Sequence, residues 1–201
     1  MRVDKLLIAT HNPGKFAEIS AKLSSLNIPL YSLKDLNISE DYEERGETFE
    51  SNAVGKAKFY YQFAKIPTLA DDSGLCVDAL GGEPGVHSRR WDGNRGTDEE
   101  ILQKLFDKLQ DVPIEKRTAT FVAVAALYDG QELIITKGEN KGVFGLAVAC
   151  PIKPGIPYSS AFYPQGYNRV ASQLSIEEKN KISHRGRAIE KLIKKLKYDQ
   201  I

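Results

Sequence analysis

The sequence predicts an α/β fold in which helices cover a mixed β-sheet. Apolar runs of strand length alternate with helical patterns in the first half of the chain, and a hairpin-like series of strands follows in the second half. This order of elements is typical of a sheet covered by helices. Because the 201 residues contain no repeat and no linker, we predict a single domain, 1–201, or two small lobes that share one sheet.

The first half supplies the alternating elements. Short apolar runs predict strands at residues 5–9, 30–33 and 68–71. Apolar residues at helical spacing predict helices at 16–26, 47–65 and 101–109. Thr97 is the expected N-cap of the last of these helices, since Glu100 follows three residues later.

The second half supplies the hairpin. Strand-like residues at 116–128 and 132–136 are joined by Asp129-Gly130, which is typical of a tight turn. We predict a further strand at 143–149, a C-terminal helix at 186–196 and a loop over the Gly- and Pro-rich residues 81–96.

Composition excludes several classes of protein. The 28 Lys and Arg residues balance 27 Asp and Glu residues, so no basic excess favours binding to nucleic acid. Any anionic ligand must be held by a local cluster. Cys76 and Cys150 form neither a disulfide framework nor a metal-binding spacing. The short apolar stretch at 6–9 is not a signal peptide or a membrane span, which favours the cytoplasm.

Residues 10–15 follow a predicted strand and precede a helix. Free backbone N–H groups, the helix dipole and the Lys15 ammonium would together attract an anion. The alternative is a plain Asn-Pro-Gly turn with a solvated lysine, and this segment alone favours the alternative. The candidate anion-binding residues are Thr10, His11, Asn12, Pro13, Gly14 and Lys15.

Thr48, Asn52 and Lys56 recur every four residues on a predicted helix and therefore share one face. Asn52 and Lys56 are suited to contact a phosphate, while Glu43, Glu44 or Glu47 lies near the helix start. A solvated polar face is the alternative, and a polar stripe alone favours it.

Asp71 and Asp72 come at the end of a predicted buried strand, where ligands gather in α/β sheets. Consecutive strand residues point to opposite faces, so we expect the two carboxylates to have different roles. One would bind a divalent cation or activate water, and the other would anchor the turn. Mg²⁺ is the cation such a site prefers when phosphates complete its shell. The alternative, weighed as equal, is an Asx turn in water.

Residues 178–186 place a lysine, a histidine and an arginine before the last predicted helix. His184 and Arg185 are suited to a planar base edge or a phosphate. The alternative is a basic capping segment with Ser183 as N-cap. Residues 89–91 would pair with an anion or form a surface salt bridge, and His87, like His11 taken alone, is expected to be an ordinary loop residue.

Taken together, these clusters contain what a polyphosphate with Mg²⁺ requires. The stretches that carry them resemble the inosine triphosphate pyrophosphatase family, enzymes that remove non-canonical purine nucleotides. The resemblance lies in residues 8–15, 44–49, 52–53, 56–57, 70–75, 77–82, 84–86, 178–180 and 182–186, in the order found in the family.

The resemblance implies an elongated mixed sheet flanked by helices, with two lobes around a central cleft, and usually a homodimer. It implies hydrolysis of ITP, dITP and XTP to the monophosphate and pyrophosphate, by Mg²⁺-assisted attack of water on the α phosphorus. Glu44 and Asp72 would bind Mg²⁺, and Asp72 would also be the catalytic base. Besides residues 10–15, the implied substrate-binding residues are Asn52, Lys56, Ser73, Lys179, His184 and Arg185.

One stretch departs from the family pattern. Ile156 stands where the family has a base-stacking phenylalanine, Ser159 replaces an aspartate, and Tyr158 is retained. All three are expected at the substrate. The alternatives are therefore a pyrophosphatase for another modified nucleotide, or a nucleotide-binding protein without catalysis.

Overall fold

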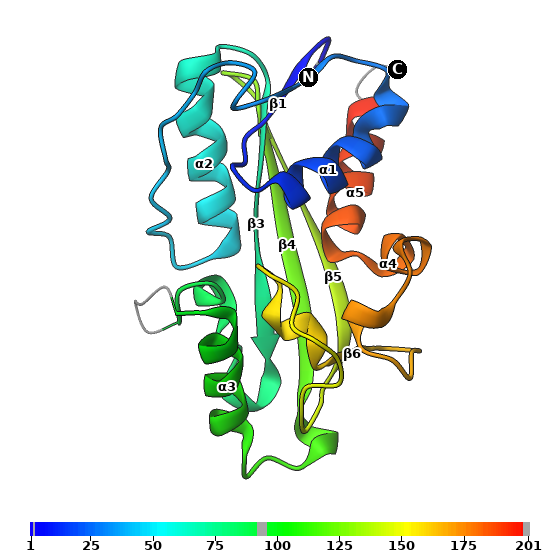
Figure 1. Cartoon of the computed structure of the whole chain (residues 1–201). Helices are drawn as coiled ribbons and strands as arrows, with labels where there is room; N and C mark the ends of the chain where they lie inside the picture. Colours follow the sequence, from blue (N-terminus) through cyan, green and yellow to red (C-terminus); the bar gives the residue numbers. More distant parts are fainter. Residues whose placement is uncertain (2, 92–95, 199–201) are drawn as a thin grey trace. The chain divides into compact units, whose positions relative to one another are not determined.

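The computed structural model describes residues 1, 3–91 and 96–198, and its core is a six-stranded sheet in the order β2-β1-β3-β4-β5-β6 (Figure 1). Strand β1 (Leu6–Ile8) is parallel to β2 (Leu30–Ser32) and β3 (Thr68–Val77), whereas β5 (Leu133–Phe144) and β6 (Phe162–Pro164) are antiparallel. The remaining strand is β4 (Thr118–Tyr128). A mixed sheet flanked by helices confirms the predicted α/β class.

The chain divides into two compact units. Unit 1 comprises Met1–Asp72, Ala123–Gly138 and His184–Ile201, and unit 2 comprises Ser73–Val122 and Glu139–Ser183. Strands β3, β4 and β5 each contribute residues to both units. The predicted cleft between lobes stays a prediction.

Unit 1 has an apolar core on each face of its part of the sheet. Helices α1 (Pro13–Leu23) and α5 (His184–Tyr198) cover one face, and α2 (Phe49–Ala64) covers the other (Figure 1). Leu69 belongs to the first core and Ala70 to the second, because successive strand residues alternate between the faces. Continuing that alternation, Asp71 points toward α1 and α5, and Asp72 points toward α2.

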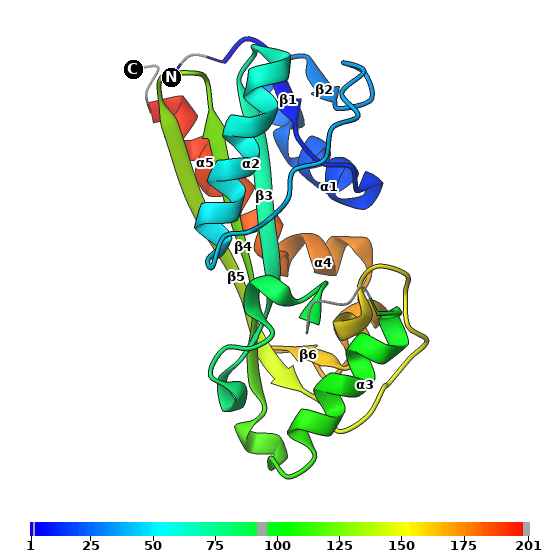
Figure 2. The ribbon, with the colours of Figure 1, turned by 90° about the vertical axis from the view of Figure 1, so that its left-hand side faces the viewer.

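Unit 2 has its own apolar core, in which Leu75, Leu105 and Phe144 are buried together. Helix α3 (Asp98–Leu109) packs against the 3-10 turn η6 (Pro157–Ser160), near β6 (Figure 2). Thr97 caps α3 with the expected reciprocal bond to Glu100. Helix α4 (Ile176–Ile182) lies in the same unit, as do the turns η2 (Asp78–Leu80), η3 (Gly85–His87), η5 (Ile114–Lys116) and η7 (Ala171–Gln173). Unit 1 adds η1 (Ser24–Leu26).

The structure corrects three element predictions. Strand β3 does not stop at Asp71 but continues to Val77. The strand predicted at 132–136 is confirmed at its start but continues to Phe144 as one strand, Leu133–Phe144. Of the separate strand predicted at 143–149, residues 143 and 144 belong to that same strand and residues 145–149 are not in a strand. The polar residues at 137–141 conceal the continuity of β5, since paired backbone rather than side-chain hydrophobicity holds them there.

Two elements were not predicted. Strand β6 has three residues, and α4 has no buried residue that would give it an apolar stripe. The other boundaries agree with the expectation to within a few residues. The loop predicted at 81–96 contains η3, and its residues 92–95 lie outside the described residues.

Candidate active site

Asp71 is the centre of an ionic cluster in unit 1. Its side chain is 1% exposed, and its Oδ2 accepts from Lys15 Nζ at 3.2 Å and from Arg185 Nε at 2.9 Å. Arg185 Nη1 also donates to Glu18 Oε2 at 2.6 Å. Burial alone would raise the pKa of Asp71, but the positive charges of Lys15 and Arg185 outweigh it and lower that pKa. Asp71 is therefore an anionic anchor, and the solvated Asx turn is wrong for it.

Asp72 lies in a different environment on the opposite face. Asn52 Nδ2 donates to its Oδ2 at 3.0 Å, and burial followed by the negative charge of Glu44 raises its pKa. The two neighbouring carboxylates thus lie on opposite faces of the strand, as predicted, and their different roles stay a prediction.

Lys56 joins the two sides of this cluster. It donates to Glu44 Oε1 and, at 3.2 Å, to the carbonyl oxygen of Asp71. Its side chain is 14% exposed and Asn52 is 1% exposed, so the solvated helix face is wrong for both residues. Thr48 is not within the helix: it is the N-cap of α2 and its side chain accepts from Ser51 N.

The turn at residues 10–15 is more self-contained than predicted. Asn12 Oδ1 accepts from Gly14 N at 2.9 Å and from Lys15 N at 3.1 Å, so these two N–H groups are not free. Thr10 Oγ1 accepts from Asn12 N, and Pro13 occupies the first turn of α1. His11 Nε2 lies 3.2 Å from the Tyr60 hydroxyl. Because Lys15 reaches Asp71, the solvated-lysine alternative is wrong.

The start of α5 brings His184 and Arg185 into the cluster. Burial and the charge of Arg185 lower the pKa of His184 to about 3, so its imidazole is neutral at pH 7. Gly138 on β5 permits this approach, since a Cβ there would lie 2.0 Å from the His184 carbonyl oxygen. Sequence reasoning missed Gly138 and Glu18; the spacing of Glu18 from Lys15, one helical turn, is the only signal for it.

The remaining predicted site residues belong to unit 2. Ser73 follows the aspartates on β3, and Lys179 lies on α4. Ile156 is 49% exposed, whereas Tyr158 is 5% exposed and donates from its hydroxyl to the Ser88 carbonyl oxygen at 2.7 Å. Ser159 Oγ donates to the Ile156 carbonyl oxygen and lies 2.6 Å from Ser172 Oγ.

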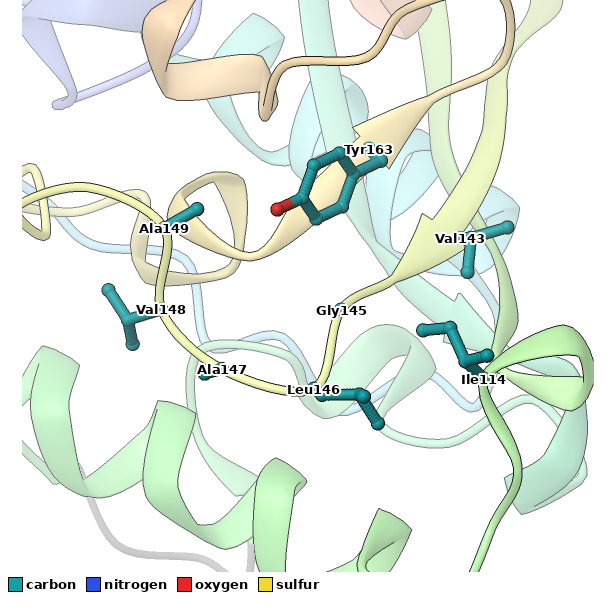
Figure 3. A pocket seen from close by; sticks show the side chains of 8 residues that line it. All are labelled: Ile114, Val143, Gly145, Leu146, Ala147, Val148, Ala149 and Tyr163. Carbon is teal, nitrogen blue, oxygen red and sulfur yellow. The ribbon is translucent and has the colours of Figure 1, made fainter.

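Two further unit 2 features are not part of this group. Arg89 pairs with Asp98, which confirms the predicted surface salt bridge for Arg89. A pocket of about 510 Å³ is apolar apart from the Tyr163 hydroxyl and contains none of the predicted site residues (Figure 3). It is lined by Ile114, Val143, Gly145, Leu146, Ala147, Val148, Ala149 and Tyr163. This lining is unsuited to a triphosphate.

Glu44 and Asp72 are suited to a hard cation. Burial, and after it the negative charge of Glu44, raise the pKa of Asp72, and a divalent ion would relieve the repulsion between the two carboxylates. No group of three or more His, Cys, Asp or Glu side chains able to hold a metal occurs in the described part of the chain. Phosphate oxygens and water would complete the coordination shell of a bound Mg²⁺. Within the same residues, no helix is long and apolar enough to cross a membrane.

Known proteins resemble this chain in sequence and in fold. The model of the Ham1 family matches residues 6–195. The dITP/XTP pyrophosphatase of Aquifex aeolicus is 42% identical over 96% of each chain, and that of Caldanaerobacter subterraneus subsp. tengcongensis is 40% identical over 94% of each. The structure of the Coxiella burnetii HAM1 protein is 35% identical, with a TM-score of 0.86, covering 96% of this chain and 98% of that one.

Proposed function

Because the chain belongs to the Ham1 family, we propose that it hydrolyses the non-canonical purine nucleotides ITP, dITP and XTP to the nucleoside monophosphate and pyrophosphate. The observation that carries the proposal is the unit 1 cluster, in which Lys15, Lys56 and Arg185 lie around Asp71 and Asp72. Phosphoryl transfer needs positioning and charge neutralisation more than covalent help from the protein.

Lys15 and Lys56 would bind the triphosphate. Each lysine already donates to a carboxylate oxygen in unit 1, and Lys56 also donates to a carbonyl oxygen. A phosphate oxygen would therefore replace one of these acceptors or share the ammonium group with it. The residues of the turn, Thr10 to Lys15, and Ser73 would contribute further polar contacts. Asn12 would keep this turn in shape, since its Oδ1 already caps α1.

Glu44 and Asp72 would hold Mg²⁺ through their carboxylate oxygens. When bound, the ion would polarise the phosphate oxygens and neutralise part of their charge. In the bound state, Lys56 would then be released from Glu44 toward the substrate.

Asp72 would accept the proton of the water that attacks the α phosphorus. Asn52 holds one oxygen of this carboxylate, which fixes its orientation on the α2 face of β3. Positioned proton transfer of this kind contributes about 10² to 10⁴ in rate.

The base would be read by His184, Arg185 and Lys179, with Ile156, Tyr158 and Ser159 as further contacts. The neutral imidazole of His184 is suited to a hydrogen bond with the purine edge, and a cationic donor is suited to a carbonyl at C6. The same donor is poorly matched to the amino group of adenine. Oxo-purines therefore fit these residues better than ATP.

We further propose that the protein forms a homodimer. Unit 2 exposes apolar side chains around its pocket, among them Leu146 at 66% and Val148 at 43%, and burial of such a patch is a usual source of association energy. Equilibrium sedimentation tests this, and a monomer at all concentrations would contradict it. The cytoplasmic location and the absence of nucleic-acid partners stay predictions.

The deciding experiment is a nucleotide panel read by pyrophosphate release with Mg²⁺ and with a chelator. ITP, dITP and XTP should be hydrolysed far faster than ATP, and the chelator should stop the reaction. Preference for a pyrimidine or methylated base would favour the other modified-nucleotide pyrophosphatase. Tight triphosphate binding without pyrophosphate release would favour the non-catalytic alternative.

A further inference from the structure

Unit 2 contains a second group of hydrogen-bond donors, built from Lys153, Lys179, Ser159 and Ser172. Lys153 Nζ donates to the Ser172 carbonyl oxygen at 2.9 Å, and the two serine hydroxyls lie 2.6 Å apart. Lys153 and Lys179 are neighbours: besides burial, the charge and side chain of Lys153 lower the pKa of Lys179. The residues come from the segment before η6, from η6, from η7 and from α4.

The charge of this group is not compensated. Among residues 1, 3–91 and 96–198, no carboxylate forms an ion pair with Lys153 or Lys179. Two neighbouring ammonium groups without a counter-charge disfavour each other. An electron-rich ligand would relieve that repulsion, so the group is suited to bind one.

We propose that Lys153 and Lys179 form a donor pair for the purine base and favour xanthine over hypoxanthine, which makes Lys153 a specificity-determining residue. The inference rests on the proposed function, which assigns the base to Lys179, Ser159 and their neighbours. Xanthine carries carbonyl oxygens at both C2 and C6, and its ring loses a proton near neutral pH. Hypoxanthine has one carbonyl and stays neutral. It therefore offers the two lysines fewer acceptor oxygens and no negative charge.

Ser159 is a neutral residue beside this pair. Its hydroxyl bonds to Ser172, whose carbonyl holds Lys153. A carboxylate at position 159 would lie beside these lysines and supply the missing counter-charge. The substitution S159D is therefore expected to weaken the attraction of the two lysines for an electron-rich base without removing either lysine.

The test compares kcat/KM for XTP and for ITP in the parent protein and in K153M, K153R, S159D and K116M. Lys116 is the matched control, an exposed lysine of unit 2 outside the donor group. K153M should lower the XTP/ITP ratio about tenfold, the loss of one charge-assisted hydrogen bond. K153R should largely restore the ratio, S159D should lower it, and K116M should leave it unchanged.

An XTP/ITP ratio that K153M leaves unchanged would overturn the inference. An equal loss for both substrates would place Lys153 on a group common to both, such as a phosphate, and parental values for both would exclude any role for Lys153 at the substrate. Titration calorimetry with the monophosphates XMP and IMP separates this inference from the proposed hydrolysis. If the parent protein hydrolyses no nucleotide, tighter binding of XMP that K153M abolishes still supports the donor pair, and equal binding of XMP and IMP overturns it.

Discussion

The two units hold their charges in opposite ways. In unit 1, Asp71 contacts two cations and Arg185 contacts two carboxylates, so the positive and negative charges of the cluster nearly cancel. In unit 2, Lys153 donates to the Ser172 carbonyl oxygen and lies beside Lys179, and neither lysine forms an ion pair with a carboxylate among the described residues. Unit 1 is therefore organised before a ligand binds, and its charged residues must exchange partners to bind one. Unit 2 offers solvent-accessible donors whose charge no carboxylate compensates within the part of the chain that the structure describes.

The largest expected effect comes from Asp72→Asn in unit 1. Loss of the proton acceptor should lower kcat for ITP and XTP by about 10² to 10⁴. Because Glu44 disfavours the charge of Asp72, the variant should unfold at a denaturant concentration no lower than the parent. Steady-state pyrophosphate release and urea denaturation measure the two quantities, and parental turnover would remove Asp72 from the mechanism.

Asp71→Asn, one residue away, should lower the stability of the fold, unlike Asp72→Asn. It leaves Lys15 and Arg185 buried without their shared carboxylate, which should cost about 3 to 5 kcal/mol of unfolding free energy. Glu43→Gln is the control, because its partner Arg45 is an exposed surface residue and such pairs contribute little. Equal stability of the Asp71 and Glu43 variants would contradict the description of unit 1 as an organised cluster.

Lys15→Met tests whether the lysines of unit 1 exchange partners. If Lys15 contacts phosphate, its loss should weaken nucleotide binding by about 1.5 to 3 kcal/mol, roughly ten- to 150-fold in KM. Lys22→Met, on the same helix and paired with Glu190, should leave KM unchanged. An unaltered KM in Lys15→Met would confine Lys15 to its structural ion pair with Asp71.

His184 makes unit 1 sensitive to acid. Its pKa is about 3 in the folded protein against an ordinary 6.5, so below pH 6.5 the unfolded chain binds a proton that the native state does not. The free energy of unfolding should therefore fall by up to about 1.4 kcal/mol per pH unit as the pH drops through this window. His184→Asn should remove this contribution, which denaturation at several pH values above and below 6.5 would measure. If the free energy of unfolding fell with pH equally steeply in the parent and in the variant, His184 would be protonated in the native state.

The smallest effect is expected in unit 2. Tyr158→Phe removes the hydrogen bond from the hydroxyl to the Ser88 carbonyl oxygen and should lower the unfolding free energy by about 1 kcal/mol. Tyr163→Phe is the matched control, because Tyr163 lines the open pocket. The same loss in both variants would mean that the buried hydrogen bond of Tyr158 contributes no more to the free energy of unfolding than the hydroxyl of Tyr163.

Local patterns predicted much of the molecule. Strand-length apolar runs located β1 to β4, the Thr97-Glu100 pair located the start of α3, and alternation along a strand separated Asp71 from Asp72. These features depend on residues close in sequence, which is why they can be recognised without a structure. The continuous β5 and the short β6 depend on partners far along the chain, so local patterns did not reveal them.

The sequence by itself determined the α/β class, the resemblance to a nucleotide-hydrolysing family, and the residue types suited to a polyphosphate. Only the tertiary structure decided how those residues are paired: Glu18 with Arg185, Lys56 with Glu44, and Lys153 beside Lys179. The physical reason is that residue type and periodicity are fixed along the chain. The environment of a charge is set by side chains brought together from distant segments, and that environment decides whether the charge is neutralised.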